Sequence, residues 1–366
     1  MNNKSIHDLQ QEAISLLKQL ISTSSFSKEE QNTARVIEYF FRNKGIARYR
    51  FINNVWAYNT HFDPLKPTII LNSHHDTVKP NSGYTKDPFS PIVENGKLYG
   101  LGSNDAGGSL VSLIATFLHF SDREDLRYNL IIAATAEEEI SGPNGIEALL
   151  VNEQFNYPFH NKGIIAGAIV GEPTQMQMAV AERGLMVLDC KAHGQAGHAA
   201  RNEGDNAVYK AIKDIDWFST YRFEKVSDLL GPVKMTVTSV NTENKAHNVV
   251  PSECSFIVDT RINELYAFEE VLDTIRSNVQ CDVKPRSTRM RSTAIALEHA
   301  LVKAGLELGR TYYGSPTTSD KALMPFPALK MGPGDSARSH TADEFIYLDE
   351  IKQGIDLYVQ LLNQLL

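Results

Sequence analysis

Cysteine is scarce in this chain, and the cysteines present lack the spacing of a redox or metal motif. Cys190, Cys254 and Cys281 are odd in number, and none forms a CxxC pair. This pattern argues against a disulfide framework and favours reduced thiols. We therefore expect a cytoplasmic protein.

Long apolar runs and an excess of basic residues are also missing. No run approaches the ~18 residues that a membrane span needs, and residues 1–8 contain no apolar stretch like that of a signal peptide. The formal net charge of the 366 residues is −8, which argues against a nucleic-acid surface. We expect neither a membrane nor a nucleic-acid partner.

Three short apolar runs, each followed by groups that can bind a metal, are the clearest positive signal. The runs cover 67–71, 129–135 and 163–170, and the groups after them are His74 and Asp76, then Glu137, Glu138 and Glu139, then Glu172. Runs of this length fit buried strands. Open α/β sheets place their sites at the carboxyl ends of such strands, so we expect these side chains to converge there.

Each local motif has an ordinary alternative. His74 and Asp76 form an HxD pair, which would also suit a loop histidine capped by a nearby carboxylate. His75 would face the other side of a continuing strand, so it is left out of the site. The three acids at 137–139 could form a solvated face, but like charges after an apolar strand repel unless a cation or protonation relieves them.

The glycine-rich segment 102–108 admits three interpretations. It contains part of a dinucleotide-binding fingerprint, but the third glycine falls at the wrong offset. It could instead be a helix start capped by Asp105. In the third interpretation Asp105 is a bridging metal ligand, and the glycines let the backbone approach.

Taken together, the dispersed residues form a candidate ligand set. His198 and His340 lie in loops, and a lone loop histidine is more often structural. Two imidazoles and three carboxylates would suffice for two zinc ions, each with one histidine, one terminal carboxylate and a share of a bridging carboxylate. This set consists of His74, Asp105, Glu139, Glu172 and His340.

The order of expected elements predicts two domains. Residues 1–177 and 292–366 alternate strands and helices in an α/β pattern, whereas 178–291 read β-α-β-β-α-β, the order of a ferredoxin-like unit. A complete supersecondary unit inside the chain suggests an inserted domain. Within these domains the patterns predict a helix opened by a capping box at 27–30, a hairpin turn at Asn53 and Asn54, one long strand at 178–192 and a helix at 294–308.

The sequence resembles the M20 metallopeptidase and deacylase family. The resemblance rests on motifs in the family's order along nearly the whole chain, at 73–78, 102–108, 136–139, 171–174, 197–199 and 339–344. It implies a zinc-peptidase-like α/β catalytic domain with a mixed central sheet flanked by helices. It also implies that the inserted domain is a lid that serves for dimerisation, so that the partner is a second copy of the chain.

The same resemblance assigns roles to single residues. His74 and Glu172 would hold one zinc, Glu139 and His340 the other, and Asp105 would bridge them. Asp76 would orient His74, and Glu138 would be the general base. His198 would reach the active site of the partner subunit, and Asn248 and Arg261 would contact substrate carboxylates.

We therefore predict a di-zinc amidohydrolase that removes the acyl group from an N-acyl amino acid, with Co²⁺ or Mn²⁺ as substitutes for Zn²⁺. Acetylornithine is the expected substrate, and N-acetylcitrulline and N-succinyl amino acids are alternatives. A dipeptidase or aminopeptidase of the same family is a further alternative. From other classes, a catalytically silent binding protein and a nucleotide-binding enzyme are the competing interpretations.

Overall fold

The computed structural model describes residues 5–157, 164–201 and 203–366, and these fold into two compact units. Unit 1 comprises Met1–Val180, Ile295–Tyr313 and Ser319–Leu366. Unit 2 comprises Ala181–Ala294 and Gly314–Thr318. The inserted domain predicted at 178–291 overlaps unit 2, and unit 2 also includes residues 314–318.

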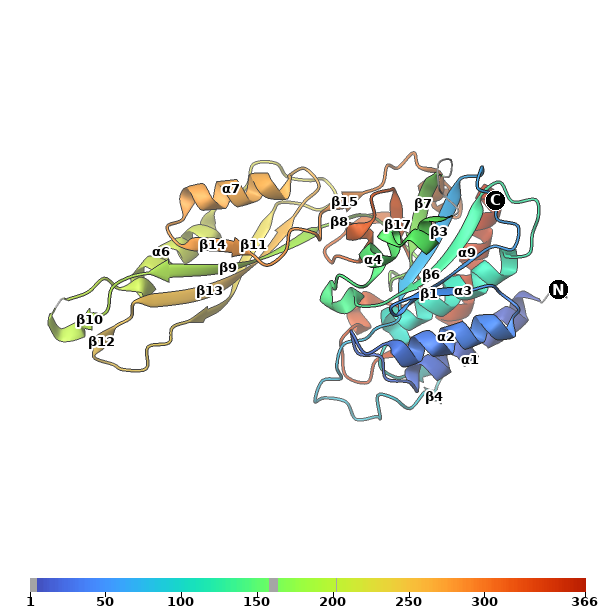
Figure 1. The fold of residues 1–366 in the computed structure, drawn as a ribbon, viewed down its shortest axis with the longest axis horizontal. Coiled ribbons are helices and arrows are strands. Elements are labelled where there is room, and N and C mark those ends of the chain that lie inside the picture. The colour runs from blue at the N-terminus through green and yellow to red at the C-terminus, as the bar shows by residue number, and fades with distance from the viewer. Residues whose placement is uncertain (1–4, 158–163, 202) are drawn as a thin grey trace. The chain divides into compact units, whose positions relative to one another are not determined.

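A mixed sheet forms the centre of unit 1 (Figure 1). Its strands, in spatial order, are β1 (Tyr49–Phe51), β2 (Asn54–Tyr58), β6 (Asn129–Thr135), β3 (Thr68–His74), β7 (Ile165–Val170), β17 (Ala328–Lys330) and β8 (Met178–Glu182). β3 is parallel to both β6 and β7, and β17 is parallel to β7, whereas β2 and β8 are antiparallel to their neighbours. Every residue of β3 and β6 is buried, as expected for strands covered on both faces.

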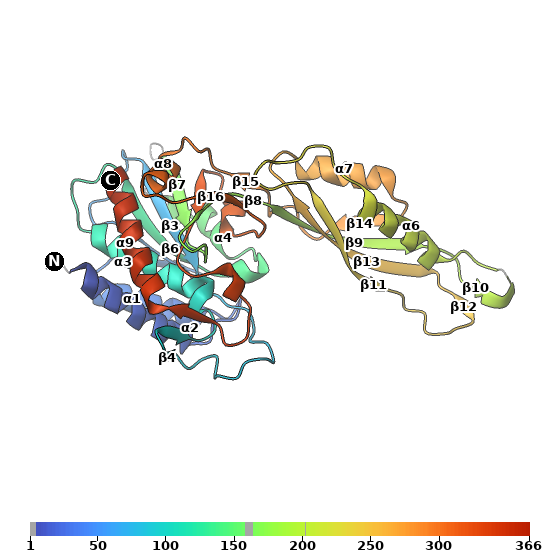
Figure 2. The same ribbon diagram turned by 180° about the vertical axis from the view of Figure 1, so that it is seen from behind.

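Helices cover both faces of this sheet (Figures 1 and 2). Ile69 and Leu71 pack into the core on one face, and Ile70 between them packs into the core on the other. The first core includes side chains of α1 (Ile6–Ile21), α2 (Gln31–Asn43), α3 (Gly108–Phe120), α8 (Ala300–Glu307) and α9 (Leu348–Leu365). The second core includes side chains of α4 (Ile146–Val151) and α5 (Glu153–Asn156).

A smaller sheet lies beside this core and adjoins the loops that carry Asp105 and His340. Its strands, in spatial order, are β18 (Phe345–Tyr347), β5 (Lys97–Tyr99) and β4 (Ile92–Glu94). Short helical turns complete unit 1 at η1 (Ser103–Gly107), η2 (Glu138–Ile140), η5 (Asp320–Leu323) and η6 (Ser336–Arg338).

Unit 2 is an antiparallel sheet with two helices. Its strands, in spatial order, are β11 (Lys234–Asn241), β13 (Glu253–Ile262), β9 (Gly184–His193) and β14 (Asp282–Pro285). The buried face of the sheet shares a core with α6 (Ala207–Thr220) and α7 (Phe268–Asn278). Along the chain these elements follow the order β-α-β-β-α-β, which the sequence predicted for a ferredoxin-like unit, so the fold class is confirmed.

Short pieces complete unit 2 and its junction with the central sheet. β10 (Gly197–His198) pairs with β12 (Val249–Val250), and η4 (Ala199–Arg201) follows β10. β15 (Thr293–Ala294) and β16 (Tyr312–Ser315) both pair with β8. Among the described residues, no helix is long and apolar enough to cross a membrane.

Several boundaries predicted from the sequence differ from those in the structure. The capping box at 27–30 does not form, because the Ser27 hydroxyl donates to Asp76 (2.7 Å) and Lys28 has a positive φ of 76°. The hairpin turn lies one residue earlier than predicted, since Phe51 pairs with Asn54. The long strand at 178–192 is interrupted between β8 and β9. The helix at 294–308 begins only at Ala300, where the His299 side chain caps it. The strand expected from Gly163 begins at Ile165, and Gly163 lies outside the described residues.

Candidate active site

The carboxyl ends of β3, β6 and β7 lie at the same edge of the central sheet, because the three strands are parallel. In the ladder His74 pairs with Thr135, and Asn72 pairs with Val170. The strands therefore deliver the HxD pair, the three acids at 137–139 and Glu172 to one place. Asp105 in η1 and His340 after η6 reach the same place from loops.

His74 turns its Nε2 atom toward carboxylates. Nε2 lies 3.3 Å from Asp105 Oδ1, 3.8 Å from Glu138 Oε2 and 3.9 Å from Glu172 Oε1. Burial alone would lower the pKa of His74, but hydrogen bonding to Asp105 and Asp76 outweighs it and raises the pKa well above the ordinary value. Because Nδ1 lies 3.0 Å from the main-chain oxygen of Asp76, Nε2 is the atom of this imidazole that a metal could take.

Asp105 lies between two histidines. Its Oδ1 faces His74 Nε2, and its Oδ2 lies 3.7 Å from His340 Nε2. His340 Nε2 is also 3.0 Å from Glu139 Oε2. A carboxylate with one oxygen toward each imidazole has the arrangement that a bridging ligand needs. His340 is exposed, which leaves this side of the site open to solvent.

The donor atoms fit divalent metal ions. Ligand atoms of His74, Asp105 and Glu139 lie within 4.8 Å of one another, and so do those of His74, Glu138 and Glu172. The second group contains Glu138, which the family resemblance assigned to proton transfer. Imidazole nitrogens and carboxylate oxygens without a thiolate suit zinc, cobalt or manganese.

Glu138 lies near the carboxylates of Glu172, Asp320 and Glu139. Burial raises the pKa of Glu138 well above its ordinary value; the His74 imidazole opposes this shift, and the Glu172 carboxylate adds to it. Such a group holds a proton readily, as a general base must after it has accepted one.

Asp76 contacts both the His74 imidazole and the turn that carries Glu138 and Glu139. His74 Nδ1 lies 3.0 Å from the main-chain oxygen of Asp76 and 3.4 Å from its carboxylate. That carboxylate accepts hydrogen bonds from the backbone N–H groups of Glu138 (3.1 Å) and Glu139 (3.2 Å). Asp76 thus holds the turn that carries both glutamates as well as the imidazole.

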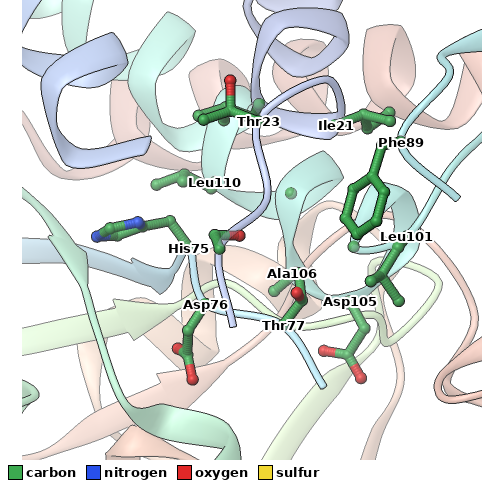
Figure 3. A pocket seen from close by; sticks show the side chains of 14 residues that line it. Ile21, Thr23, His75, Asp76, Thr77, Phe89, Leu101, Asp105, Ala106 and Leu110 are labelled. Atoms are coloured by element: carbon green, nitrogen blue, oxygen red, sulfur yellow. The ribbon is translucent and has the colours of Figure 1, made fainter. Parts of the chain in front are cut away.

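A pocket is lined by residues of the loops that carry Asp76 and Asp105. Leu101, Leu110 and Phe89 are among the residues that line it, and both carboxylates point to the same side, away from Leu110 (Figure 3). The pocket is thus lined by residues beside the candidate ligands, Asp105 among them.

Sequence reasoning missed three buried carboxylates around this edge. Glu344 accepts hydrogen bonds from the Asp105 loop, and burial together with the Asp105 charge raises its pKa to about 8. Asp320 accepts a hydrogen bond from Thr135 Oγ1 (2.6 Å), and burial raises its pKa to about 6. Glu30 accepts the backbone N–H of Glu137 (3.3 Å). Glu344 lies in the 339–344 motif and Glu30 in the pattern read as a capping box, but neither pattern indicated these contacts.

The remaining predicted residues lie in unit 2. His198 in β10 pairs with Val249, and the main-chain oxygen of Asn248 accepts from Ala199 N (3.0 Å), so His198 and Asn248 are neighbours. Arg261 lies near the far end of β13, opposite Leu185. Its Nε and Nη2 both donate to the Asp259 carboxylate, at 2.8 and 3.0 Å.

The chain is similar to known proteins along nearly its full length. The model of peptidase family M20/M25/M40 matches residues 70–364. A succinyl-diaminopimelate desuccinylase of Corynebacterium glutamicum is 27% identical over 376 residues, which cover 98% of each chain. A protein of the same name from Wolbachia pipientis subsp. Culex pipiens is 24% identical over 376 residues, covering 96% of this chain and 92% of that one.

Solved structures also resemble the fold. An M20 family metallo-carboxypeptidase from Sulfolobus solfataricus superposes with a TM-score of 0.75 at 16% identity, covering 96% of this chain and 98% of that one. A dinuclear metal-binding M20 peptidase from Bacillus subtilis gives a TM-score of 0.73 at 15% identity, covering 97% of each chain. At this level of identity the likeness concerns the fold alone.

Proposed function

Because the chain belongs to peptidase family M20/M25/M40, whose model covers residues 70–364, we propose that this hydrolase is a di-zinc enzyme that removes the acyl group from an N-acyl amino acid. The observation that carries the proposal is the carboxylate of Asp105, which has one oxygen toward His74 and the other toward His340. A shared carboxylate between two imidazoles is suited to a pair of metal ions.

The proposed ligands divide into two sets around Asp105. His74 and Glu172 would hold one ion, and Glu139 and His340 would hold the other, with Co²⁺ or Mn²⁺ as substitutes for Zn²⁺. When bound, such ions polarise an amide carbonyl and lower the pKa of a coordinated water. The open side at His340 would admit the substrate.

Glu138 is the proposed proton carrier. It would accept a proton from the attacking water and return it to the nitrogen of the leaving amine. Its carboxylate is held against the site by the backbone of residues 138–139, which Asp76 anchors through two hydrogen bonds. Asp76 thus acts as a positioning residue for the base.

The acyl group is proposed from the relatives. Proteins similar over nearly the whole chain are named succinyl-diaminopimelate desuccinylase, which favours an N-succinyl amino acid over the acetylornithine that the sequence motifs predicted. Acetylornithine and N-acetylcitrulline remain the next substrates to test. Asn248 and Arg261 are proposed to bind substrate carboxylates, and Arg261 would do so while part of its guanidinium faces Asp259.

The assembly and location are part of the same proposal. A homodimer would supply His198 in trans, and the three buried free cysteines suit a reducing cytoplasm. The net charge of −8 gives no support to a nucleic-acid partner.

A substrate panel tests the proposal. Metal-free and zinc-loaded protein would be assayed for released amine on N-succinyl-diaminopimelate, acetylornithine, N-acetylcitrulline and simple dipeptides. We expect zinc-dependent turnover with the highest kcat/KM on an N-succinyl substrate, and none with Glu138→Gln protein purified in the same way. Preferred cleavage of dipeptides would overturn the deacylase assignment, and absence of turnover on every substrate would overturn the enzyme assignment.

A further inference from the structure

A buried carboxylate organises the loop that carries Asp105. Glu344 is 2% exposed. Its Oε1 accepts the backbone N–H groups of Asn104 (2.8 Å) and Asp105 (2.9 Å), and its Oε2 accepts that of Gly102 (2.9 Å). Three amides that converge on one carboxylate fix the direction in which the Asp105 side chain leaves the backbone.

A second connection joins the same two segments. The Asn104 side chain donates from Nδ2 to the main-chain oxygen of Asp335 (3.0 Å) and accepts the Asp335 N–H at Oδ1 (3.0 Å). Residues 335–344 include His340. The loop of Asp105 and the loop of His340 are therefore tied together on both sides of that histidine.

The other candidate ligands are held independently of Glu344. His74 ends β3, and Glu172 follows β7 by two residues, so the central sheet places both. Glu139 is placed by Asp76 through its backbone N–H. Only Asp105 and His340 depend on the loops that Glu344 and Asn104 connect.

We propose that Glu344 is a positioning residue that sets the Asp105 loop against the His340 loop and thereby controls affinity for the metal ion held by Glu139 and His340. The ion held by His74 and Glu172 depends on it less, because two of its ligands are fixed by strands. This inference rests on the proposed di-metal function.

Glu344→Gln separates positioning from folding. The amide has nearly the same shape but only one acceptor oxygen, and its NH₂ group cannot accept the N–H of a backbone amide. At least one of the three amides therefore loses its partner. The exchange keeps the size of the buried side chain and creates no cavity, so the metal-free variant should still fold, and its circular dichroism spectrum would check this.

Zinc titration of metal-free protein, followed by calorimetry, tests the proposal. We expect two tight ions in the wild type, and in Glu344→Gln one tight ion and a second at least about 30-fold weaker. Asp343→Asn is the matched control, because this neighbouring carboxylate also accepts backbone amides, but those of Thr85 and Lys86. It should retain two tight ions.

The outcomes distinguish this inference from the proposed function. A wild-type protein that binds no zinc would overturn the function, whereas two tight ions in a folded Glu344→Gln protein would overturn the role of Glu344 alone. If Glu344→Gln does not fold, Asn104→Ala breaks the second connection between the loops and should weaken the same ion. Two tight ions in Asn104→Ala would then contradict the proposal.

Discussion

Glu138 and Glu139 are adjacent in the sequence, but their carboxylates have different neighbours. Glu138 faces His74 and Glu172, whereas Glu139 lies against His340. We expect Glu138→Gln to lower kcat by at least about 100-fold with zinc content unchanged, because it removes a base and not a proposed ligand. Glu139→Ala should instead lose zinc. Steady-state kinetics and elemental analysis would separate the two effects.

Glu137 supplies the control for that pair. Its carboxylate accepts from Asn144 Nδ2 (2.9 Å), and Glu137 belongs to neither group of candidate ligands among the described residues. Glu137→Gln should therefore keep both zinc and turnover. The division of roles would be wrong if Glu138→Gln remained active or if Glu137→Gln were the inactive variant.

His340 should make metal binding depend on pH. The hydrogen bond to Glu139 raises the pKa of His340 to about 9 in the metal-free protein. Zinc needs the neutral imidazole, so affinity at this site should rise about tenfold per pH unit between about pH 7 and pH 9. Calorimetry in buffers of different ionisation enthalpy would count the proton released.

The metal-free fold should show the opposite trend. The ion pair of His340 with Glu139 stabilises the fold fully near pH 6.5, the ordinary histidine pKa, as long as Glu139 is ionised, and this stabilisation is lost as the pH rises through about 9. Its contribution to the free energy of unfolding should follow that course in wild type and vanish in His340→Ala. Zinc affinity that did not change over this range would contradict the raised pKa.

Residue types at strand ends were predictable, but the carboxylates that support them were not. His74, Glu139 and Glu172 follow apolar runs that reveal the edge of a sheet. Glu344 and Asp320 act through partners that are distant in sequence, such as Gly102 and Thr135. No local pattern records such contacts, and only the folded chain shows them.

At the scale of elements, the sequence predicted strands better than helix starts. The apolar runs specify buried strands, and the β-α-β-β-α-β order specified unit 2. The start of helix α2 was predicted too early, because the Ser27 hydroxyl bonds to Asp76 and does not cap the helix. Tertiary hydrogen bonds of this kind override local capping preference.

The η1 turn gives a prediction about glycine. A Cβ on Gly107 would lie 2.4 Å from the Gly102 carbonyl oxygen and 2.6 Å from Leu17 Cδ1. Gly107→Ala must push this turn apart, so we expect the free energy of unfolding to fall by about 1–3 kcal/mol. Asp105, in the same turn, would move, and zinc affinity should fall as well. Chemical denaturation of metal-free protein and zinc titration would measure both.

Gly96→Ala is the comparison for this variant. Gly96 has a φ of +76° with nothing within 4 Å of a new Cβ, so only left-handed strain of about 1 kcal/mol is expected. Zinc binding should not change. The crowding argument fails if Gly107→Ala is no more damaging than Gly96→Ala and binds zinc normally.

At the scale of the whole molecule, unit 2 carries its proposed functional residues at opposite ends. His198 and Asn248 lie beyond the end of the sheet where Glu253 pairs with His193, and Arg261 lies near the other end. The eight residue-to-residue steps from Glu253 to Arg261 span roughly 25 Å of strand. One small substrate cannot touch both ends of one unit 2. His198 and its neighbour Asn248 would therefore come from one subunit and Arg261 from the other, in line with the proposal that a partner subunit supplies His198.

Mixing inactive chains tests this arrangement. Glu138→Gln chains and His198→Ala chains should each be inactive, and their mixture should regain activity when subunits exchange. One site of each mixed dimer would then hold both wild-type groups. Exchange would be checked with labelled chains. A mixture that exchanges and stays inactive would show that His198 acts within its own chain or not at all.

The position of β17 in the central sheet has a consequence for how this protein is made. β17 lies between β7 and β8, yet the ribosome releases it only after all of unit 2 up to residue 294. The emerging chain therefore presents unpaired edges on β7 and β8 for on the order of ten seconds, at ordinary rates of translation. During that interval unit 2 can fold while the larger unit stays incomplete. A cell that slows translation before residue 328 would prolong exposure of those edges and with it the need for chaperones.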